Sequence, residues 1–341
     1  MISKNQNIEI RTSPHIVQGV HTHDIMRNVV LALLPVAGFA VFAFGLGALT
    51  VLAVATASCV LTEYLFSRAS GQGSTIGDWS ATITGLLYGL TLPVGLPLWM
   101  VALGGVIAIG LGKYLFGGLG MNAFNPALVG RAALQAAFPV ALTTWQPAFT
   151  PDRFTTLPSS TFAFPFAKPV WDAVTSATPL GAMKFDNQTT SSFDLAMGFT
   201  SGSLGETSAL IILLGGLYLA ARKMMNWRIP AAILLTVFLL SSLLHMADSE
   251  QFPDGLFMIF SGGLMLGAVF MATDMVASPL TSLGATLYGI LIGVLVVVIR
   301  IWGGLPEGVM YAILCANAVS PHIDAAFQPR VYGTPKKKWL R

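Results

Sequence analysis

Charged residues are scarce in this chain of 341 residues. They make up 10% of the sequence, against 54% for hydrophobic residues, and the mean hydropathy is +0.72. Soluble domains carry about 25% charged residues. Because the shortage extends along the whole chain, the sequence predicts a polytopic membrane protein rather than one or two soluble domains. The net charge of +3 identifies no partner, and we expect no nucleic acid among the partners.

Cysteine and the common catalytic motifs are also missing or nearly so. Cys59 and Cys315 lie far apart within apolar runs, which argues against a disulfide framework and against a cysteine-ligated cluster. The chain has no GxSxG, HExxH, Walker A or dinucleotide-binding motif. We therefore expect no catalytic residues of an independent enzyme and no metal site. We also expect no signal peptide, because residues 1–24 are polar and the following apolar run is of full spanning length.

Apolar runs are what the sequence has in abundance. About ten of them are long enough, or nearly so, to cross roughly 30 Å of hydrocarbon. They are predicted at residues 25–45, 47–67, 79–93, 97–116, 125–142, 207–223, 228–245, 255–273, 284–301 and 305–321. The third and eighth runs are short and rich in glycine and proline. The predicted fold class is an all-α membrane protein with about ten transmembrane helices.

The two halves of the chain resemble each other. The sequence LFGGL at 115–119 precedes an apolar segment, as does IWGGL at 301–305. Residues 88–93 also occupy the same place in the first half as residues 270–274 in the second. Five spans are an odd number, so the second half would enter the membrane from the opposite face. The sequence therefore predicts two inverted five-helix repeats with interrupted helices, a plan that places binding sites near the membrane midplane.

Basic residues predict the orientation of this arrangement. With a cytoplasmic amino terminus, thirteen of the 18 lysines and arginines lie on the cytoplasmic side, four lie opposite, and Arg131 lies within a span. The predicted regions are a cytoplasmic polar arm at 1–24, a first repeat at 25–142, an extracytoplasmic loop at 143–206, a second repeat at 207–321 and a basic cytoplasmic tail at 322–341. The loop is rich in aromatic residues, so we expect a folded lid rather than a solvated linker.

The loop contains a small, hydroxyl-rich stretch at residues 172–180. Small neighbours leave the hydroxyl of Thr178 approachable, and Pro179 biases Thr178 toward an extended backbone. A modifying enzyme could grip such a threonine and join it to a phosphate. The residues alone favour an ordinary Ser/Thr turn over such a modification site.

Several motifs in order resemble one known family. They are residues 13–15 (SPH), 117–127 (GGLGMNAFNPA), 176–180 (SATPL), 267–274 (GAVFMATD), the run 300–317 and 330–333 (RVYG). Together they resemble the D subunit of the Rnf ion-translocating ferredoxin:NAD oxidoreductase complex. The chain is also similar to the B subunit of the sodium-pumping NADH:quinone reductase. The resemblance covers nearly the whole sequence.

The resemblance implies a covalent cofactor. In that family, the threonine at the place of Thr178 carries FMN through a phosphoester bond, which a flavin transferase forms on the exported side. The attachment motif corresponds here to Asp172, Thr175, Ser176, Ala177 and Thr178, with Ser176 where glycine is common. The resemblance further implies a bacterial inner-membrane complex of several subunits that couples electron transfer to Na⁺ or H⁺ movement. A second, non-covalent flavin such as riboflavin is also expected.

Two further groups of residues are candidates for sites. Asn122 and Asn125 lie in a glycine-rich segment and can hydrogen-bond a flavin or a quinone-like ring, although small residues there also suit tight helix packing. Ionisable residues within or beside apolar runs are candidates for an ion path; they are Glu63, Lys113, Arg131, Asp274, Arg300 and Glu307. We favour Asp274, which either lines that path or pairs with Lys113 or Arg131.

Two other functions are compatible with the predicted fold. An inverted five-plus-five arrangement also suits a solute channel or transporter without a redox role. The chain could also be a structural anchor for soluble redox subunits. The presence of flavin on Thr178 would distinguish an electron carrier from a channel or transporter. Loss of electron transfer in Thr178→Val, with the complex intact, would exclude a purely structural anchor.

Overall fold

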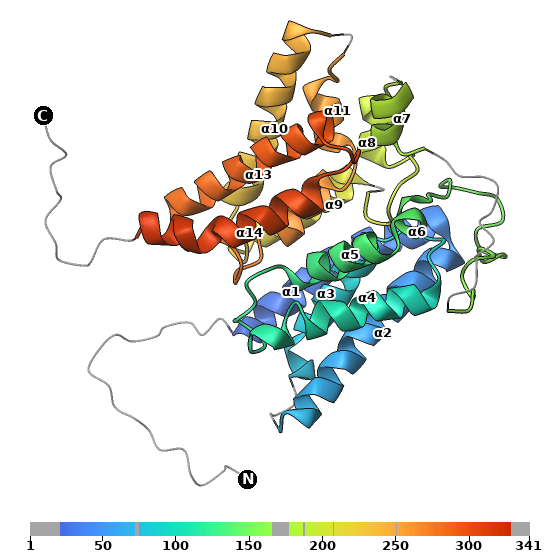
Figure 1. The fold of residues 1–341 in the computed structure, drawn as a ribbon, viewed down its shortest axis with the longest axis vertical. Helices are drawn as coiled ribbons and strands as arrows, with labels where there is room; N and C mark the ends of the chain where they lie inside the picture. Colours follow the sequence, from blue (N-terminus) through green and yellow to red (C-terminus); the bar gives the residue numbers. More distant parts are fainter. Residues whose placement is uncertain are drawn as a thin grey trace, which may run out of the picture.

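The computed structural model describes residues 21–71, 75–165, 177–186, 188–206, 208–249 and 251–328, and within them every regular element is helical (Figure 1). Within these described ranges, five segments are long and apolar enough to cross a membrane. They are α1 (Thr22–Phe44), α2 (Leu46–Ala69), the segment Leu98–Phe116 formed by α4 (Leu98–Gly110) and η2 (Tyr114–Phe116), α10 (Arg228–Ala247) and α13 (Ser282–Trp302). The shorter helices α3 (Ser80–Leu90) and α9 (Ala209–Ala221) are also apolar. The chain is a multi-pass membrane protein.

The first half is built around α2. Helices α3 and α4 both pack on α2, and α4 also packs on α5 (Pro126–Ala137). Helix α3 ends early because Pro93 and Pro97 follow and lack the backbone N–H that a continuing helix needs. Helix α5 begins at Asn125, whose side chain accepts a hydrogen bond of 3.0 Å from the N–H of Ala127.

The second half repeats this pattern of packing. Helix α10 packs on α13 and on α11 (Gly255–Phe260), and α13 packs on α14 (Val309–Ala326). The apolar run between α10 and α13 is divided into α11, α12 (Leu264–Leu266) and η3 (Gly267–Met271). Element η3 is a π-helical turn, in which the N–H of Ala272 donates to the carbonyl of Gly267. Such turns break the regular helix and occur often at functional sites.

The two halves meet along two pairs of helices. Helix α1 of the first half packs on α9 of the second, and α5 packs on α14. Figure 1 shows the blue-to-green helices of the first half against the yellow-to-red helices of the second. The two contacts therefore join helices at the start and at the end of each half.

The described part of the loop is folded against the helix ends, although several of its aromatic side chains, such as Phe162 and Phe164, are exposed. It contains the short helix α8 (Ser192–Met197) and the longer α7 (Pro179–Asp186). Its backbone bonds to the first half, where the N–H of Gly205 donates to the carbonyl of Leu90 at 2.6 Å. Lys184 bonds to the second half through the carbonyls of Arg300 (2.9 Å) and Gly303.

Two predicted spans are less regular than expected. The run 125–142 was expected to form one helix, but α5 ends at Ala137 and α6 (Pro139–Thr143) follows. Pro139 has no N–H to continue the hydrogen-bond ladder, so the helix restarts there. The run 97–116 likewise changes from α4 to the 3-10 turn η2. The arm up to residue 20 and the tail from residue 329 lie outside the described residues.

Close contact between α4 and α5 predicts a sensitive glycine. A Cβ atom at Gly130 would lie 2.7 Å from the carbonyl oxygen of Gly104, whereas one at Gly38 would meet nothing within 4 Å. We expect Gly130→Ala to lower the free energy of unfolding by about 1–3 kcal/mol through overpacking. Thermal unfolding in detergent measures this, with Gly38→Ala as the matched control; equal stability of both variants would contradict the close packing.

Candidate functional site

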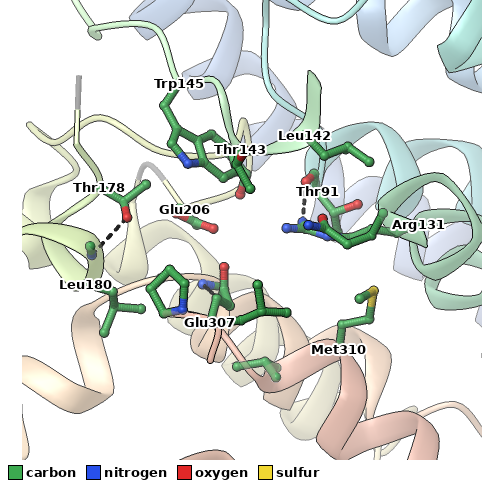
Figure 2. Close-up of a pocket in the computed structure, with 18 of the residues that line it drawn as sticks. Thr91, Arg131, Leu142, Thr143, Trp145, Thr178, Leu180, Glu206, Glu307 and Met310 are labelled. Atoms are coloured by element: carbon green, nitrogen blue, oxygen red, sulfur yellow. Dashed lines mark hydrogen bonds between the residues drawn. The ribbon is translucent and has the colours of Figure 1, made fainter. Parts of the chain in front are cut away.

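A cavity of about 570 Å³ lies where the loop meets both halves of the chain (Figure 2). Its walls come from the end of α3, from α5, from α7 and from the segments that precede α9 and α14. Small-molecule sites in proteins typically measure roughly 300–1,000 Å³. The polar residues that face the cavity include Thr91, Arg131, Thr178, Glu206 and Glu307. The interruptions of the helices thus leave room for a ligand beside the loop.

Thr178 lies in the wall of this cavity, immediately before α7. Its side-chain oxygen accepts a hydrogen bond of 3.1 Å from the N–H of Gly181, as an N-cap residue does. Pro179 follows as the first residue of the helix, a position where its missing N–H costs nothing. Ala177 is exposed and Thr178 is half-buried. The other motif residues, Asp172, Thr175 and Ser176, lie outside the described residues.

Lys184 holds α7 against the second half. Its ammonium group donates to the carbonyls of Arg300 at 2.9 Å and Leu305 at 3.1 Å, and also to that of Gly303. These carbonyls belong to the end of α13 and the segment after it, where the helix dipole favours a cation. Partial burial lowers the pKa of Lys184 below its usual value. The lysine thereby positions the helix that begins beside Thr178.

Two arginines and two glutamates form a cluster at the cavity. Figure 2 shows Glu206 and Glu307 between Thr178 on one side and Arg131 on the other. Glu307 accepts a hydrogen bond of 2.5 Å from the N–H of Gly263, and its Oε1 lies 3.9 Å from Nη2 of Arg300. Arg131 donates to the carbonyl of Thr91. The four charged side chains come from α5, α13 and two connecting segments.

The pKa values of Glu206 and Glu307 are shifted in opposite directions. Both residues lie in connections outside the helices. Burial raises the pKa of Glu206, and the negative charge of Glu307 raises it further. Burial also acts to raise the pKa of Glu307, but Arg131, a hydrogen bond from Glu206 and Arg300 together hold it below its usual value. At neutral pH the pair therefore favours a protonated Glu206 beside an ionised Glu307.

A second, smaller cavity of about 110 Å³ brings together four of the predicted residues, Lys113, Asn122, Asn125 and Asp274. Nδ2 of Asn122 lies 3.3 Å from Oδ2 of Asp274, and Nδ2 of Asn125 donates to the carbonyl of Met271 at 3.1 Å. Burial raises the pKa of Asp274, and bonds from Val276 and Asn122 oppose this rise. Asparagine and aspartate from separate motifs thus share one site.

The alternative pairing of Asp274 with Lys113 or Arg131 is wrong. Lys113 instead bonds to Glu63, with Nζ 2.7 Å from Oε1, and to the hydroxyl of Ser80 at 2.6 Å. The guanidinium of Arg131 faces the first cavity and bonds to Thr91. Each of these buried cations therefore has a nearer acceptor than Asp274.

The two cavities share two elements in their walls. Helix α5 and its N-cap present Asn125 to the smaller cavity and Leu128 to the larger one. Element η3 presents Phe270 to the smaller cavity and Met271 to the larger one. The sites that the two cavities offer are therefore neighbours in the structure.

Glu206 is the site residue for which the sequence predicts no role. It lies in the loop outside the ten apolar runs, so it is not among the ionisable residues within or beside them. Its neighbours Leu204 and Gly205 are buried in the structure, so this end of the loop packs against the helices. Its approach to Glu307 depends on the tertiary structure.

Comparison with known proteins identifies the family. The NQR2, RnfD, RnfE family matches residues 9–333. The chain belongs to this family. The D subunit of a proton-translocating ferredoxin:NAD(+) oxidoreductase complex from Clostridium ljungdahlii is 41% identical to this protein. The match covers 97% of this chain and 98% of the relative.

Two further relatives show the same extent of similarity. The D subunit of the Na(+)-translocating ferredoxin:NAD(+) oxidoreductase complex of Acetobacterium woodii is 39% identical, over 97% of each chain. The D subunit of the ion-translocating oxidoreductase complex of Stutzerimonas stutzeri is 41% identical, over 93% of this chain and 96% of the relative. The resemblance inferred from the motifs is thereby confirmed.

The contacts of Lys184 predict that the position of α7 depends on this side chain. Lys184→Met removes the charged hydrogen bonds to the end of α13, each typically worth about 1.5–3 kcal/mol. We expect faster amide hydrogen exchange across residues 179–186, which is measured by mass spectrometry. Lys223→Met, at an exposed position, is the control. Unchanged exchange in Lys184→Met would show that other contacts hold α7.

Proposed function

We propose that this chain is the D subunit of an Rnf-type ion-translocating ferredoxin:NAD oxidoreductase complex and carries electrons through FMN joined to Thr178. The observation that carries the proposal is the position of Thr178, whose side chain lines the cavity of about 570 Å³. Membership of the family and the names of the three relatives, each a D subunit, support the same function.

The residues around Thr178 fit an FMN group. Trp145, Leu180 and Met310 supply aromatic and apolar surface for a planar ring. Nε of Arg131 is buried and has no hydrogen-bond partner among the described residues, so it is available to an anionic group. The start of α7 favours the negative charge of a phosphate. Bound FMN supplies reversible electron transfer, and the protein supplies position and electrostatic surroundings.

A flavin transferase is the partner that this attachment requires. Thr178 is half-buried and Ala177 is exposed, which supports access to the hydroxyl from the cavity mouth. We assign Asp172, Thr175, Ser176 and Ala177 to the motif that the transferase recognises. In the modified chain, a phosphoester would join the phosphate of FMN to Oγ1 of Thr178 and would leave the ring free for redox chemistry.

We further propose that the chain consists of ten membrane segments in two inverted five-helix repeats. The packing of α2 on α3 and α4 has its counterpart in the packing of α10 on α11 and α13. The contacts of α1 with α9 and of α5 with α14 each join equivalent helices, as a two-fold axis between repeats requires. The distribution of basic residues supports cytoplasmic termini and an exported loop in a bacterial inner membrane.

In this proposal the complex translocates Na⁺ or H⁺, and Asp274 contributes to the ion path. The relatives from Clostridium ljungdahlii and Acetobacterium woodii are named for protons and for Na⁺ respectively. Asp274 follows the π-helical turn η3 and lines the smaller cavity. An acidic group at a break in a membrane helix is a common element of ion pathways.

We assign a second, non-covalent flavin such as riboflavin to the smaller cavity. Asn122 and Asn125 supply amide groups there, and Asp274 supplies a carboxyl group. A volume of about 110 Å³ is too small for a flavin ring, so binding requires the flexible side chains of Met224 and Met225 to move aside. The elements shared by the walls of the two cavities support electron exchange between two carriers.

Covalent flavin provides the decisive test. The full chain is co-expressed with its flavin transferase, and denaturing electrophoresis is read by flavin fluorescence. We expect a fluorescent band for the natural chain and none for Thr178→Val. Thr143→Val, in the same cavity, should keep the band because the Thr143 hydroxyl bonds only to carbonyls of α6. A natural chain without fluorescence would favour the channel or transporter instead.

The second flavin is tested by separate quantification. Flavin extracted by denaturation is non-covalent, whereas flavin that stays with the chain is covalent. We expect Asn122→Leu to lower extractable flavin about tenfold, the effect of about 1.4 kcal/mol, and to leave covalent flavin unchanged. Thr178→Val should abolish covalent flavin and leave extractable flavin unchanged. Extractable flavin that is unaffected by Asn122→Leu would place the second group elsewhere.

A further inference from the structure

The carboxyl groups of Glu206 and Glu307 form a pair within the larger cavity. Their side chains are hydrogen-bonded to each other. Two ionised carboxylates contain no hydrogen to donate, so such a bond requires a proton on one of them. Without that proton, the buried Oε1 of Glu206 would have no hydrogen-bond donor among the described residues.

The neighbouring donors determine which group holds the proton. Glu307 accepts the N–H of Gly263 at 2.5 Å and lies 3.9 Å from Arg300. Arg300 is almost completely buried and also donates to two backbone carbonyls, at 2.6 and 2.9 Å. These contacts stabilise an ionised Glu307. The Ser203 hydroxyl favours an ionised Glu206 as well, but burial outweighs it, so the first proton resides on Glu206.

Charged groups on every surrounding element define the electrostatics of the pair. Arg131 approaches from α5 and Arg300 from α13, while Lys184 on α7 is engaged by carbonyl groups. Asp186 and Tyr311 also line the cavity. Two guanidinium groups beside the pair disfavour a bound metal cation, and no group of three or more potential metal ligands occurs among the described residues. The chemistry therefore favours a proton over Na⁺ at this place.

We propose that Glu206 and Glu307 share one proton and bind a second when the FMN group in their cavity is reduced. This inference rests on the proposed attachment of FMN to Thr178. One electron reaches the FMN group from a reduced carrier of the complex, such as an iron–sulfur centre. One proton from water at the cavity mouth forms an O–H bond on the pair, and no other bond changes. The negative charge of the electron is thereby compensated within the cavity.

The physical basis is the effect of one charge on another in a poorly screened site. Added negative charge favours the protonated form of a nearby carboxyl group. The pair is suited to this response because it holds a proton already and its remaining charge lies on a single group. When one proton is taken up per electron, the equilibrium constant for reduction changes tenfold per pH unit. For a one-electron couple this is a change of about 59 mV in the midpoint potential.

The shared proton is tested without any flavin. Infrared difference spectra of full-length Thr178→Val in lipid nanodiscs are recorded as a function of pH. We expect the C=O band of a protonated carboxyl group at neutral pH, and its loss in the double variant with Glu206→Gln. Asp186→Asn should retain it. Absence of the band in Thr178→Val, or its retention in the double variant with Glu206→Gln, would overturn the shared proton whatever the flavin content.

The coupling is tested in the flavin-loaded chain. The midpoint potential of the covalent flavin should fall by about 59 mV per pH unit as pH rises. We expect Glu307→Gln, which removes the group that takes up the second proton, to abolish this slope and Asp186→Asn to keep it, with size-exclusion profiles confirming that each variant is folded. An unchanged slope in Glu307→Gln would refute the coupling. A chain without covalent flavin would refute the proposed function but leave the infrared result on the pair standing.

Discussion

A charged group buried in an apolar membrane protein needs hydrogen-bond partners within the protein, and Arg300 shows how much structure depends on this. Both of its terminal nitrogens have partners, whereas its Nε has none among the described residues. Its side chain bonds to carbonyls at the end of α11 and faces Glu307 before α14. Its own carbonyl accepts Lys184 of α7. The side chain and the backbone carbonyl of Arg300 therefore join α13 to α11, to the segment before α14 and to α7 of the loop. These elements lie around the larger cavity.

Helix interruptions create both cavities. Helix α3 stops before two prolines, and α12 continues into the π-helical turn η3, so neither crosses the full apolar layer as a regular helix. Backbone groups released at such breaks need polar partners, and asparagine and arginine side chains supply them. Asn125 bonds to the carbonyl of Met271, and Arg131 bonds to that of Thr91. The same side chains that stabilise the breaks thus line the spaces beside them.

Continuous apolar segments were predictable from the sequence, because a lipid environment demands long uninterrupted helices. The runs 25–45 and 228–245 correspond closely to α1 and α10. The break at Pro139 was not predicted, since composition around it stays apolar. Thr178 was singled out by its motif rather than by physical chemistry. The contact between Asn122 and Asp274 joins residues 152 positions apart, and the approach of Glu206 to Glu307 likewise depends on how the halves assemble.

The loop is fastened to both halves at once. Gly205 bonds to Leu90 in the first half, and Lys184 bonds to the end of α13 in the second. Transporters with alternating access rely on one bundle rocking against the other around a central site. A strap across the two bundles resists that motion at its own end of the molecule. In the proposed complex, these contacts favour ion movement through local rearrangements of side chains and interrupted helices over rocking of one whole bundle against the other.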